Sequence, residues 1–127
     1  HAEQRLFSRV SQLKPLKAKK PHLIVGIGGC VAQKEKAALT KRFPFVDIVF
    51  GTNAINDVIP LLERVERGEG PVISVPDEGP APSSELVASS NGPRIHAWVS
   101  VMRGCDNYCS YCVVPYVRGA SAKQRAG

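Results

Sequence analysis

Three cysteines that lie close together are the residues whose type and spacing could do chemistry. Cys105, Cys109 and Cys112 fall within eight residues of one another. A 4Fe–4S cluster normally takes four thiolate ligands, so three thiolates on one loop would hold three of its irons and leave the fourth open. An open iron can chelate a ligand through an amine and a carboxylate, both of which the methionine end of S-adenosylmethionine offers. Three thiolates at this spacing would therefore suit a 4Fe–4S cluster whose open iron can take such a ligand.

Zinc is the main alternative metal that these thiols could bind. Structural zinc takes four ligands, and the fourth would have to be Asp106, His96 or Cys30. Disulfide bonds are disfavoured by the positions of the cysteines, because Cys30 lies 75 residues upstream of Cys105. Clustered cysteines without a secretory signal more often serve metal or redox chemistry than structural bridges.

Composition and charge narrow the class of protein. The 127 residues are 43% hydrophobic and 22% charged, as is ordinary for a soluble globular protein. No apolar run approaches the roughly 18 residues of a membrane span, and the polar N-terminus carries no secretory signal, so we expect a cytoplasmic protein without a membrane partner. The net charge of +6 is concentrated at the two ends of the chain. These basic ends either attract a polyanion such as RNA or form solvated helix faces.

The elements that must position the cysteines alternate between strands and helices. Short apolar runs predict strands at residues 23–27, 46–50 and 72–75. Apolar residues at helical spacing predict helices at 1–19, broken or kinked at Pro15, at 33–42, and from a cap at Thr52 or Asn53 to about 67. This alternation favours an α/β fold with a parallel sheet and crossover helices. Active residues in such sheets follow the carboxyl ends of strands, which is where we expect Cys30.

A change in composition marks a domain boundary. Residues 79–94 are rich in proline, glycine and serine, as linkers are. The sequence after them alternates between apolar and polar residues over 95–102, which predicts a strand that leads into the cysteines. We therefore predict one domain at residues 1–78, a linker at 79–94, and the start of a second domain at 95–127.

Two motifs carry a resemblance to a known family. The spacing of the three cysteines is the signature of the radical S-adenosylmethionine superfamily. The run RGCDNYCSYCVVPYVRG from Arg103 to Gly119 resembles the cluster loop of the methylthiotransferases. GGCVAQ, from Gly28 to Gln33, resembles the third cysteine motif of their N-terminal domain, and residues 46–62 also fit that domain. The resemblance covers nearly the whole chain.

The resemblance implies a fold and a set of cofactors. It implies the last part of a three-layer, flavodoxin-like N-terminal domain, followed by the start of a radical S-adenosylmethionine (β/α) partial barrel. Cys105, Cys109 and Cys112 would ligate the cluster that binds S-adenosylmethionine, and Tyr111 would pack near its adenine. Cys30 would be one of three ligands of an auxiliary 4Fe–4S cluster, the other two lying upstream of this sequence.

The resemblance also implies a reaction. The 113–119 run and the GGCVAQ motif are most similar to the branch that methylthiolates C2 of N6-isopentenyladenosine at position 37 in the anticodon loop of tRNA. One S-adenosylmethionine would donate a methyl group, and a second would give the 5′-deoxyadenosyl radical that abstracts hydrogen. The alternatives are a methylthiotransferase for threonylcarbamoyladenosine in tRNA or for a ribosomal protein and, from another class, a zinc- or RNA-binding module.

The same resemblance sets expectations for partners and completeness. It implies an electron donor of the flavodoxin or ferredoxin type, and we expect a monomer. After Gly119 the sequence departs from the family's pattern. We therefore expect a fragment of a longer enzyme, one that is inactive alone.

Overall fold

Two regions make up the computed structural model of this chain, which describes residues 2–77, 102–119 and 122–123. The first region holds a parallel sheet of three strands in the order β1 (Gly26–Gly28), β2 (Ile48–Phe50) and β3 (Val72–Ser74). Ile27 lies opposite Val49, which lies opposite Ile73. The predicted parallel sheet is confirmed, although each strand is shorter than its apolar run.

Helix α1 (Ala2–Lys19) is continuous through Pro15, so the helix does not break there, and the alternative of a kink stays a prediction. Proline lacks the N–H group that would bond to the carbonyl of Ser11. Ser11 and Pro15 are both exposed, and water can satisfy the carbonyl that proline leaves unpaired. The helix therefore continues at a moderate cost.

The helix predicted at residues 33–42 is two short helices, α2 (Cys30–Glu35) and α3 (Ala38–Arg42). The chain turns between them at Lys36, whose φ of 49° lies in the left-handed region. A lysine is rarely found in that region, and no glycine or proline marks the turn. This correction also moves the helix start three residues upstream, to Cys30.

The next helix begins later than predicted. A single 3-10 turn, η1 (Ile55–Asp57), leads into α4 (Val58–Glu66). Neither Thr52 nor Asn53 caps this helix, because their side chains bond elsewhere.

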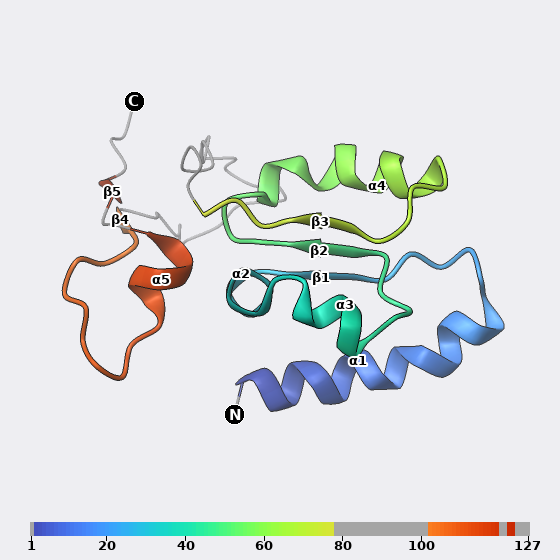
Figure 1. Cartoon of the computed structure of the whole chain (residues 1–127), viewed down its shortest axis with the longest axis horizontal. Coiled ribbons are helices and arrows are strands. Elements are labelled where there is room, and N and C mark those ends of the chain that lie inside the picture. Colours follow the sequence, from blue (N-terminus) through green and yellow to red (C-terminus); the bar gives the residue numbers. More distant parts are fainter. Residues whose placement is uncertain (1, 78–101, 120–121, 124–127) are drawn as a thin grey trace, which may run out of the picture.

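Two apolar clusters lie on opposite faces of the sheet. Ile27 and Val49 pack with residues of α1, α2 and α3, whereas Ile48 and Val72 pack with Leu61 of α4. Figure 1 shows α4 on one side of the strands and α1 to α3 on the other. Helices on both faces of a parallel sheet make three layers, which fits the flavodoxin-like domain that the sequence predicted.

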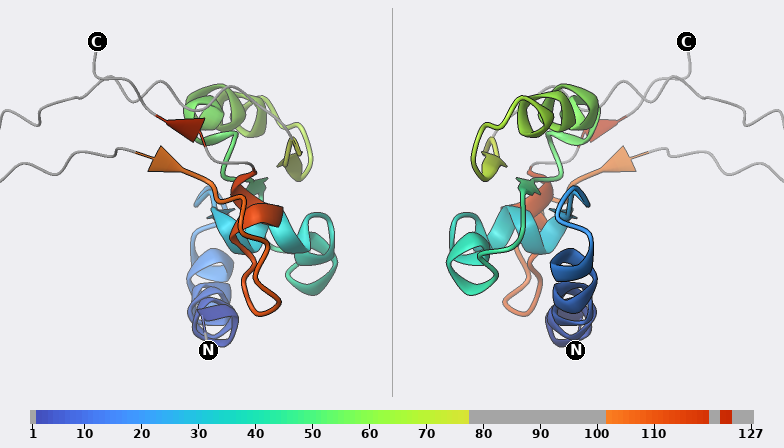
Figure 2. Two further views of the ribbon diagram at one scale, coloured as in Figure 1. Left: turned by 90° about the vertical axis from the view of Figure 1, so that its left-hand side faces the viewer. Right: turned by 90° about the vertical axis from the view of Figure 1, so that its right-hand side faces the viewer.

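The second region is a small unit that contains the three clustered cysteines. Strands β4 (Met102–Arg103) and β5 (Ala122–Lys123) pair antiparallel, and α5 (Val114–Arg118) lies between them in sequence. Figure 2 shows this unit from two further sides. The predicted barrel would begin with parallel strands, and no such pair occurs in the described part of this unit.

Part of the predicted organisation lies outside the described residues. The linker at 79–94 and all but the last residue of the strand predicted at 95–102 fall in the gap between 77 and 102. The domain limits at 78 and 95 therefore stay predictions. Within the ranges that the structure describes, no helix has the length and hydropathy to cross a membrane.

Candidate metal centre

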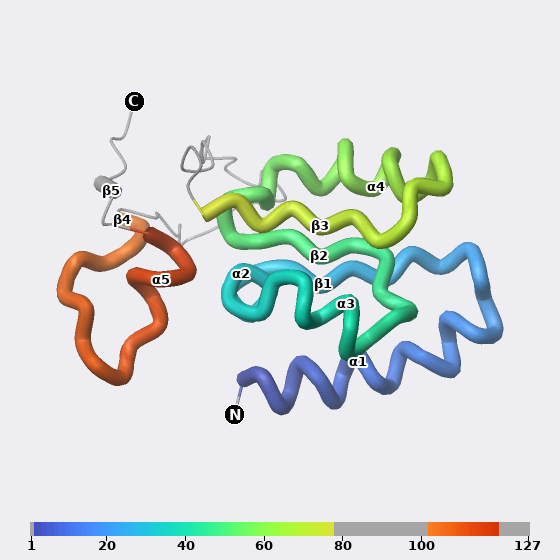
Figure 3. Tube along the Cα trace, in the orientation of Figure 1, coloured from blue at the N-terminus to red at the C-terminus, as the bar shows by residue number. Residues whose placement is uncertain are grey.

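The three clustered cysteines lie on residues 104–119, which we call the cysteine loop. The amide of Cys105 donates to the carbonyl of Gly119 over 3.3 Å, so the loop returns to its start. Figure 3 shows this closed path. A tighter turn inside the loop joins the amide of Cys112 to the carbonyl of Cys109 at 3.0 Å. Gly104 and Tyr108 adopt positive φ angles of 78° and 46°, which bend the chain on either side of Cys105.

The thiols of this loop fit a metal cluster by their chemistry. Cys105, Cys109 and Cys112 are all free, and all are partly exposed, so ligands can reach them. Among the described residues, no three Cys, His, Asp or Glu side chains are grouped closely enough to hold a metal ion. The loop thus supplies three soft donors within one short segment, and binding a cluster would require the thiols to turn toward one another.

Tyr111, predicted to lie near the adenine of S-adenosylmethionine, is 91% exposed. Two other tyrosines of the loop contact each other instead. The rings of Tyr108 and Tyr116 meet edge to face, with centroids 5.9 Å apart. The loop therefore presents aromatic surface to solvent beside its thiols, and the adenine contact of Tyr111 stays a prediction.

Cys30 lies where the parallel-sheet rule places active residues. It is the first residue of α2, and it follows the end of β1 after the single residue Gly29. Gly29 has a φ of 96°, and this turn lets α2 start directly at the carboxyl end of the strand. The thiol of Cys30 is free and partly exposed. The predicted position is confirmed, and the ligand role stays a prediction.

The helix that starts at Cys30 contacts the cysteine loop. Helices α2 and α5 pack against each other, and α5 begins two residues after Cys112. Figures 1 and 2 show these helices side by side. Segments 75 residues apart in the sequence, which carry all four cysteines, are thus neighbours at one end of the sheet.

Sequence reasoning missed three polar residues that join the loop to the sheet. The Nη2 atom of Arg103 donates to the carbonyl of Thr52 at 2.6 Å and to Oδ1 of Asn53 at 2.9 Å. The hydroxyl of Thr52 donates to the carbonyl of Val117 in α5. Thr52 and Asn53 follow the carboxyl end of β2, so the rule that located Cys30 could also have pointed to them.

Gln33 extends this polar contact into the first region. Its side chain is 3% exposed, and its Nε2 donates to the carbonyl of Pro76 at 3.0 Å. Its Oε1 is buried without a hydrogen-bond partner in the described residues and lies against Gly51. A Cβ at Gly51 would sit 1.8 Å from that oxygen, so only glycine leaves room for the Gln33 amide.

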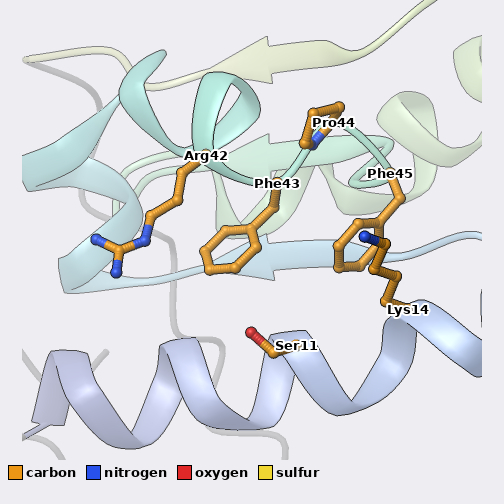
Figure 4. Close-up of a pocket in the computed structure, with 6 residues that line it drawn as sticks. All are labelled: Ser11, Lys14, Arg42, Phe43, Pro44 and Phe45. Carbon is orange, nitrogen blue, oxygen red and sulfur yellow. The ribbon is translucent and has the colours of Figure 1, made fainter.

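A separate groove lies between α1 and the segment that follows α3. It has a volume of about 400 Å³ and is lined by Ser11, Lys14, Arg42, Phe43, Pro44 and Phe45 (Figure 4). The guanidinium of Arg42 stacks over the ring of Phe7 at 4.1 Å. None of the predicted site residues lines this groove, so it does not enter the candidate centre.

Comparisons with known proteins agree with the family resemblance. Residues 1–51 match the family described as "Uncharacterized protein family UPF0004". Proteins named tRNA-2-methylthio-N(6)-dimethylallyladenosine synthase are similar over nearly the whole chain. The one from Carboxydothermus hydrogenoformans is 40% identical over 98% of this chain, and the one from Legionella pneumophila strain Corby is 46% identical over 93%.

A third relative of the same name, from Pelobacter propionicus, is 42% identical over 99% of this chain. The chain covers 28%, 26% and 29% of the lengths of these three relatives. The predicted resemblance to the methylthiotransferases of tRNA is confirmed, and it concerns roughly a quarter of such a protein.

Proposed function

We propose that this chain is part of a radical S-adenosylmethionine methylthiotransferase that acts on tRNA. The proposed product is the 2-methylthio derivative of N6-isopentenyladenosine, the nucleoside that the relatives' names describe. The chain spans only about a quarter of those relatives, so the activity is proposed for the whole protein.

One observation carries this proposal. The helix that starts at Cys30 packs against the helix that follows Cys112, so two cysteine-bearing segments meet at the carboxyl end of one sheet. Sulfur insertion into a base requires a sulfur source and a radical source at the same atom. Two thiol sites on neighbouring elements would satisfy that requirement.

Each residue has a role in this proposal. Cys105, Cys109 and Cys112 would hold the first 4Fe–4S cluster, with Tyr111 beside the bound S-adenosylmethionine. Cys30 would supply one ligand to the auxiliary cluster. When bound, the first cluster supplies the electron that cleaves S-adenosylmethionine to the 5′-deoxyadenosyl radical, and the auxiliary cluster carries the sulfur. The exposed tyrosines of the cysteine loop, Tyr108, Tyr111 and Tyr116, would be accessible to a base.

The substrate base must be unstacked to reach such a site. Single-stranded loops of RNA allow this, because their bases can be splayed out and stacked on aromatic side chains. Helix α1 would help to attract tRNA, since its exposed residues include Arg5, Arg9 and Lys14. In this proposal a flavodoxin or ferredoxin donates the electron, and the enzyme is a cytoplasmic monomer.

Metal analysis tests the first half of the proposal. After anaerobic reconstitution with iron and sulfide, we expect about four irons on the cysteine loop. Adding S-adenosylmethionine should change the electron paramagnetic resonance spectrum of the reduced cluster. Stoichiometric zinc, with no uptake of iron, would refute the radical mechanism and favour a zinc-binding module.

Nucleoside analysis tests the second half. Mass spectrometry of tRNA from a strain that lacks the gene should show isopentenyladenosine without its 2-methylthio group, and the restored gene should bring the group back. Loss of the methylthio group from threonylcarbamoyladenosine or from a ribosomal protein instead would assign the enzyme to another branch. An unchanged profile of all three would contradict the proposed reaction.

A further inference from the structure

The two-residue segment Thr52–Asn53 holds both ends of the cysteine loop. Arg103, which immediately precedes the loop, donates from Nη2 to the carbonyl of Thr52 and to Oδ1 of Asn53, at 2.6 and 2.9 Å. The Thr52 hydroxyl donates to the carbonyl of Val117, near the end of the loop. Because the loop also closes on itself, these bonds fix it as one body against the end of β2.

The same bonds continue to the helix of Cys30. The Nδ2 atom of Asn53 donates to the carbonyls of Pro76 and Asp77, at 3.3 and 3.4 Å. Nε2 of Gln33 donates to the carbonyl of Pro76 at 3.0 Å, and Gln33 lies in the helix that Cys30 begins. A continuous polar path therefore runs from the cysteine loop through Asn53 to the helix of Cys30.

This polar arrangement would lower the stability of the fold if its role were packing alone. Nη1 of Arg103 is buried without a hydrogen-bond partner in the described residues, and so is Oε1 of Gln33. A buried polar group that lacks a partner opposes folding, and an apolar contact of similar shape would avoid that penalty. What the polar path adds is direction, since each bond fixes an angle as well as a distance.

We propose that Arg103 and Asn53 are positioning residues that form a latch between the cysteine loop and the sheet. The latch sets the distance and angle between Cys30 and the loop that carries Cys105, Cys109 and Cys112. This inference rests on the proposed function, in which both cysteine sites act on one base held between them. A displacement of about 1 Å between reacting groups can cost on the order of a hundredfold in rate, which gives the latch a chemical purpose.

Hydrogen exchange in the full-length protein without metal tests the latch directly. Arg103→Gln replaces the charged guanidinium that bridges Thr52 and Asn53 by a shorter, neutral amide. The loop amides with internal hydrogen bonds should then exchange about tenfold faster or more, since a charge-assisted bond has been lost. The amides to follow are those of Cys105, Cys112, Tyr116, Val117 and Gly119. Amides of β1 to β3 should keep their exchange rates in this variant. The control is Arg67→Gln, which removes an exposed arginine at the end of α4 and should leave the exchange of the loop amides unchanged.

A double-mutant cycle separates a latch from two independent contacts. Asn53→Ala removes the other partner, so it should accelerate the same loop amides. Combining it with Arg103→Gln should add less than twofold to the larger single effect, because both changes break one unit. Arg103→Lys keeps a charged donor on a shorter side chain and should fall between wild type and Arg103→Gln. If Arg103→Gln does not fold, Asn53→Ala and Arg103→Lys still give the comparison.

A second measurement asks whether position, and not stability, is what the latch controls. In the reconstituted enzyme, the latch variants should bind as much iron as wild type and still cleave S-adenosylmethionine. They should form at least about tenfold more 5′-deoxyadenosine per methylthiolated nucleoside, because the radical would be generated away from its target.

Two results would overturn the latch. One is loop exchange within twofold of wild type in both Arg103→Gln and Asn53→Ala, and the other is an unchanged ratio of 5′-deoxyadenosine to product. Absence of iron binding in the wild type would instead refute the proposed function. Hydrogen exchange in the metal-free protein would still test the latch in that case.

Discussion

The three-layer region of residues 2–77 and the cysteine loop differ in what holds them in place. The first region buries two apolar clusters on either side of a parallel sheet. In the loop, only Pro115 and Val117 are buried, and its hold on the sheet includes hydrogen bonds from Arg103 and Thr52. The sheet thus provides a stable frame, while the loop has little core of its own and depends on that frame.

This difference suits a centre that has to bind a metal cluster. A loop with few buried contacts can rearrange when its thiols gather around irons, at little cost to the sheet. A sheet with its own core keeps the position of Cys30 while that happens. Substitutions in the two regions should therefore separate chemistry from folding.

The largest expected effect is on the chemistry of the loop. In the full-length protein, Cys109→Ala should reduce cleavage of S-adenosylmethionine to background, because two thiolates cannot hold the cluster as three do. Cys109 is partly exposed and forms no disulfide bond, so this substitution should hardly change the midpoint of urea unfolding. The measurements are iron content, 5′-deoxyadenosine formation and urea unfolding. Ser110→Ala, at the exposed neighbouring position, is the matched control. Normal 5′-deoxyadenosine formation by Cys109→Ala would contradict the ligand role.

The next effect should appear in the sheet region. Leu39 in α3 is 1% exposed and belongs to the cluster that joins α1, β1 and β2. Leu39→Ala should lower the free energy of unfolding by about 2–5 kcal/mol, since it leaves a cavity in that cluster. Urea unfolding followed by circular dichroism measures the change. Ile59→Ala removes a side chain that is 63% exposed and should have a far smaller effect. Equal losses in the two variants would mean that the cluster does not stabilise the fold.

A polar contact inside the sheet region should have an intermediate effect. The carboxylate of Asp47 accepts from the ammonium of Lys17 at 2.8 and 3.0 Å and from the amide of Val25 at 2.7 Å. Asp47→Ala should cost about 1–3 kcal/mol, because both donors lose a charged partner. Denaturant unfolding gives the number, with exposed Glu66→Ala as the control. A loss no larger than that of the control would show that the Asp47 carboxylate does not help to hold α1 on the sheet.

The smallest effect is expected at an exposed ion pair. Glu3 in α1 and Lys34 in α2 lie 2.6 Å apart. Their hydrogen bond lowers the pKa of the Glu3 carboxyl and raises the pKa of the Lys34 ammonium. The pair stabilises the fold at neutral pH. That contribution is lost as the pH falls through the folded pKa of Glu3, and again as it rises through the folded pKa of Lys34.

Because solvent screens this pair, Glu3→Gln should change the melting temperature by about 1 °C or less at neutral pH. The difference between variant and wild type should vanish in acid, where Glu3 is protonated in both states of the wild type. Thermal unfolding at several pH values measures it. A difference that grew in acid would be inconsistent with the assigned sign.

The sheet region could be predicted because its signals are local. Three apolar runs, with a helical pattern between each and the next, were enough to predict the parallel sheet and the place of Cys30 at its carboxyl end. The turn at Lys36 escaped prediction, since a lysine with a positive φ has no sequence signature. The continuity of α1 through Pro15 also escaped prediction, since a propensity rule does not include the exposure of Ser11 and Pro15.

The candidate site was only partly visible in the sequence. The spacing of Cys105, Cys109 and Cys112 predicts three thiolate donors, and their ligand role stays a prediction. The contact of Arg103 with Asn53 joins residues 50 positions apart and follows no period, so no pattern could reveal it. Asn53 was predicted to cap a helix because asparagine often does so, but its amide bonds to Arg103 and to the segment after β3 instead.

The close approach of Gln33 to Gly51 also constrains how this protein can evolve. Any side chain at position 51 would occupy the space of the Gln33 amide, so neither residue can change freely while the other is kept. A shorter residue at position 33 would make room, but it would remove the bond to Pro76 and with it one link between α2 and the end of β3. Among relatives we therefore expect these two positions to vary together or not at all, as a single inherited unit.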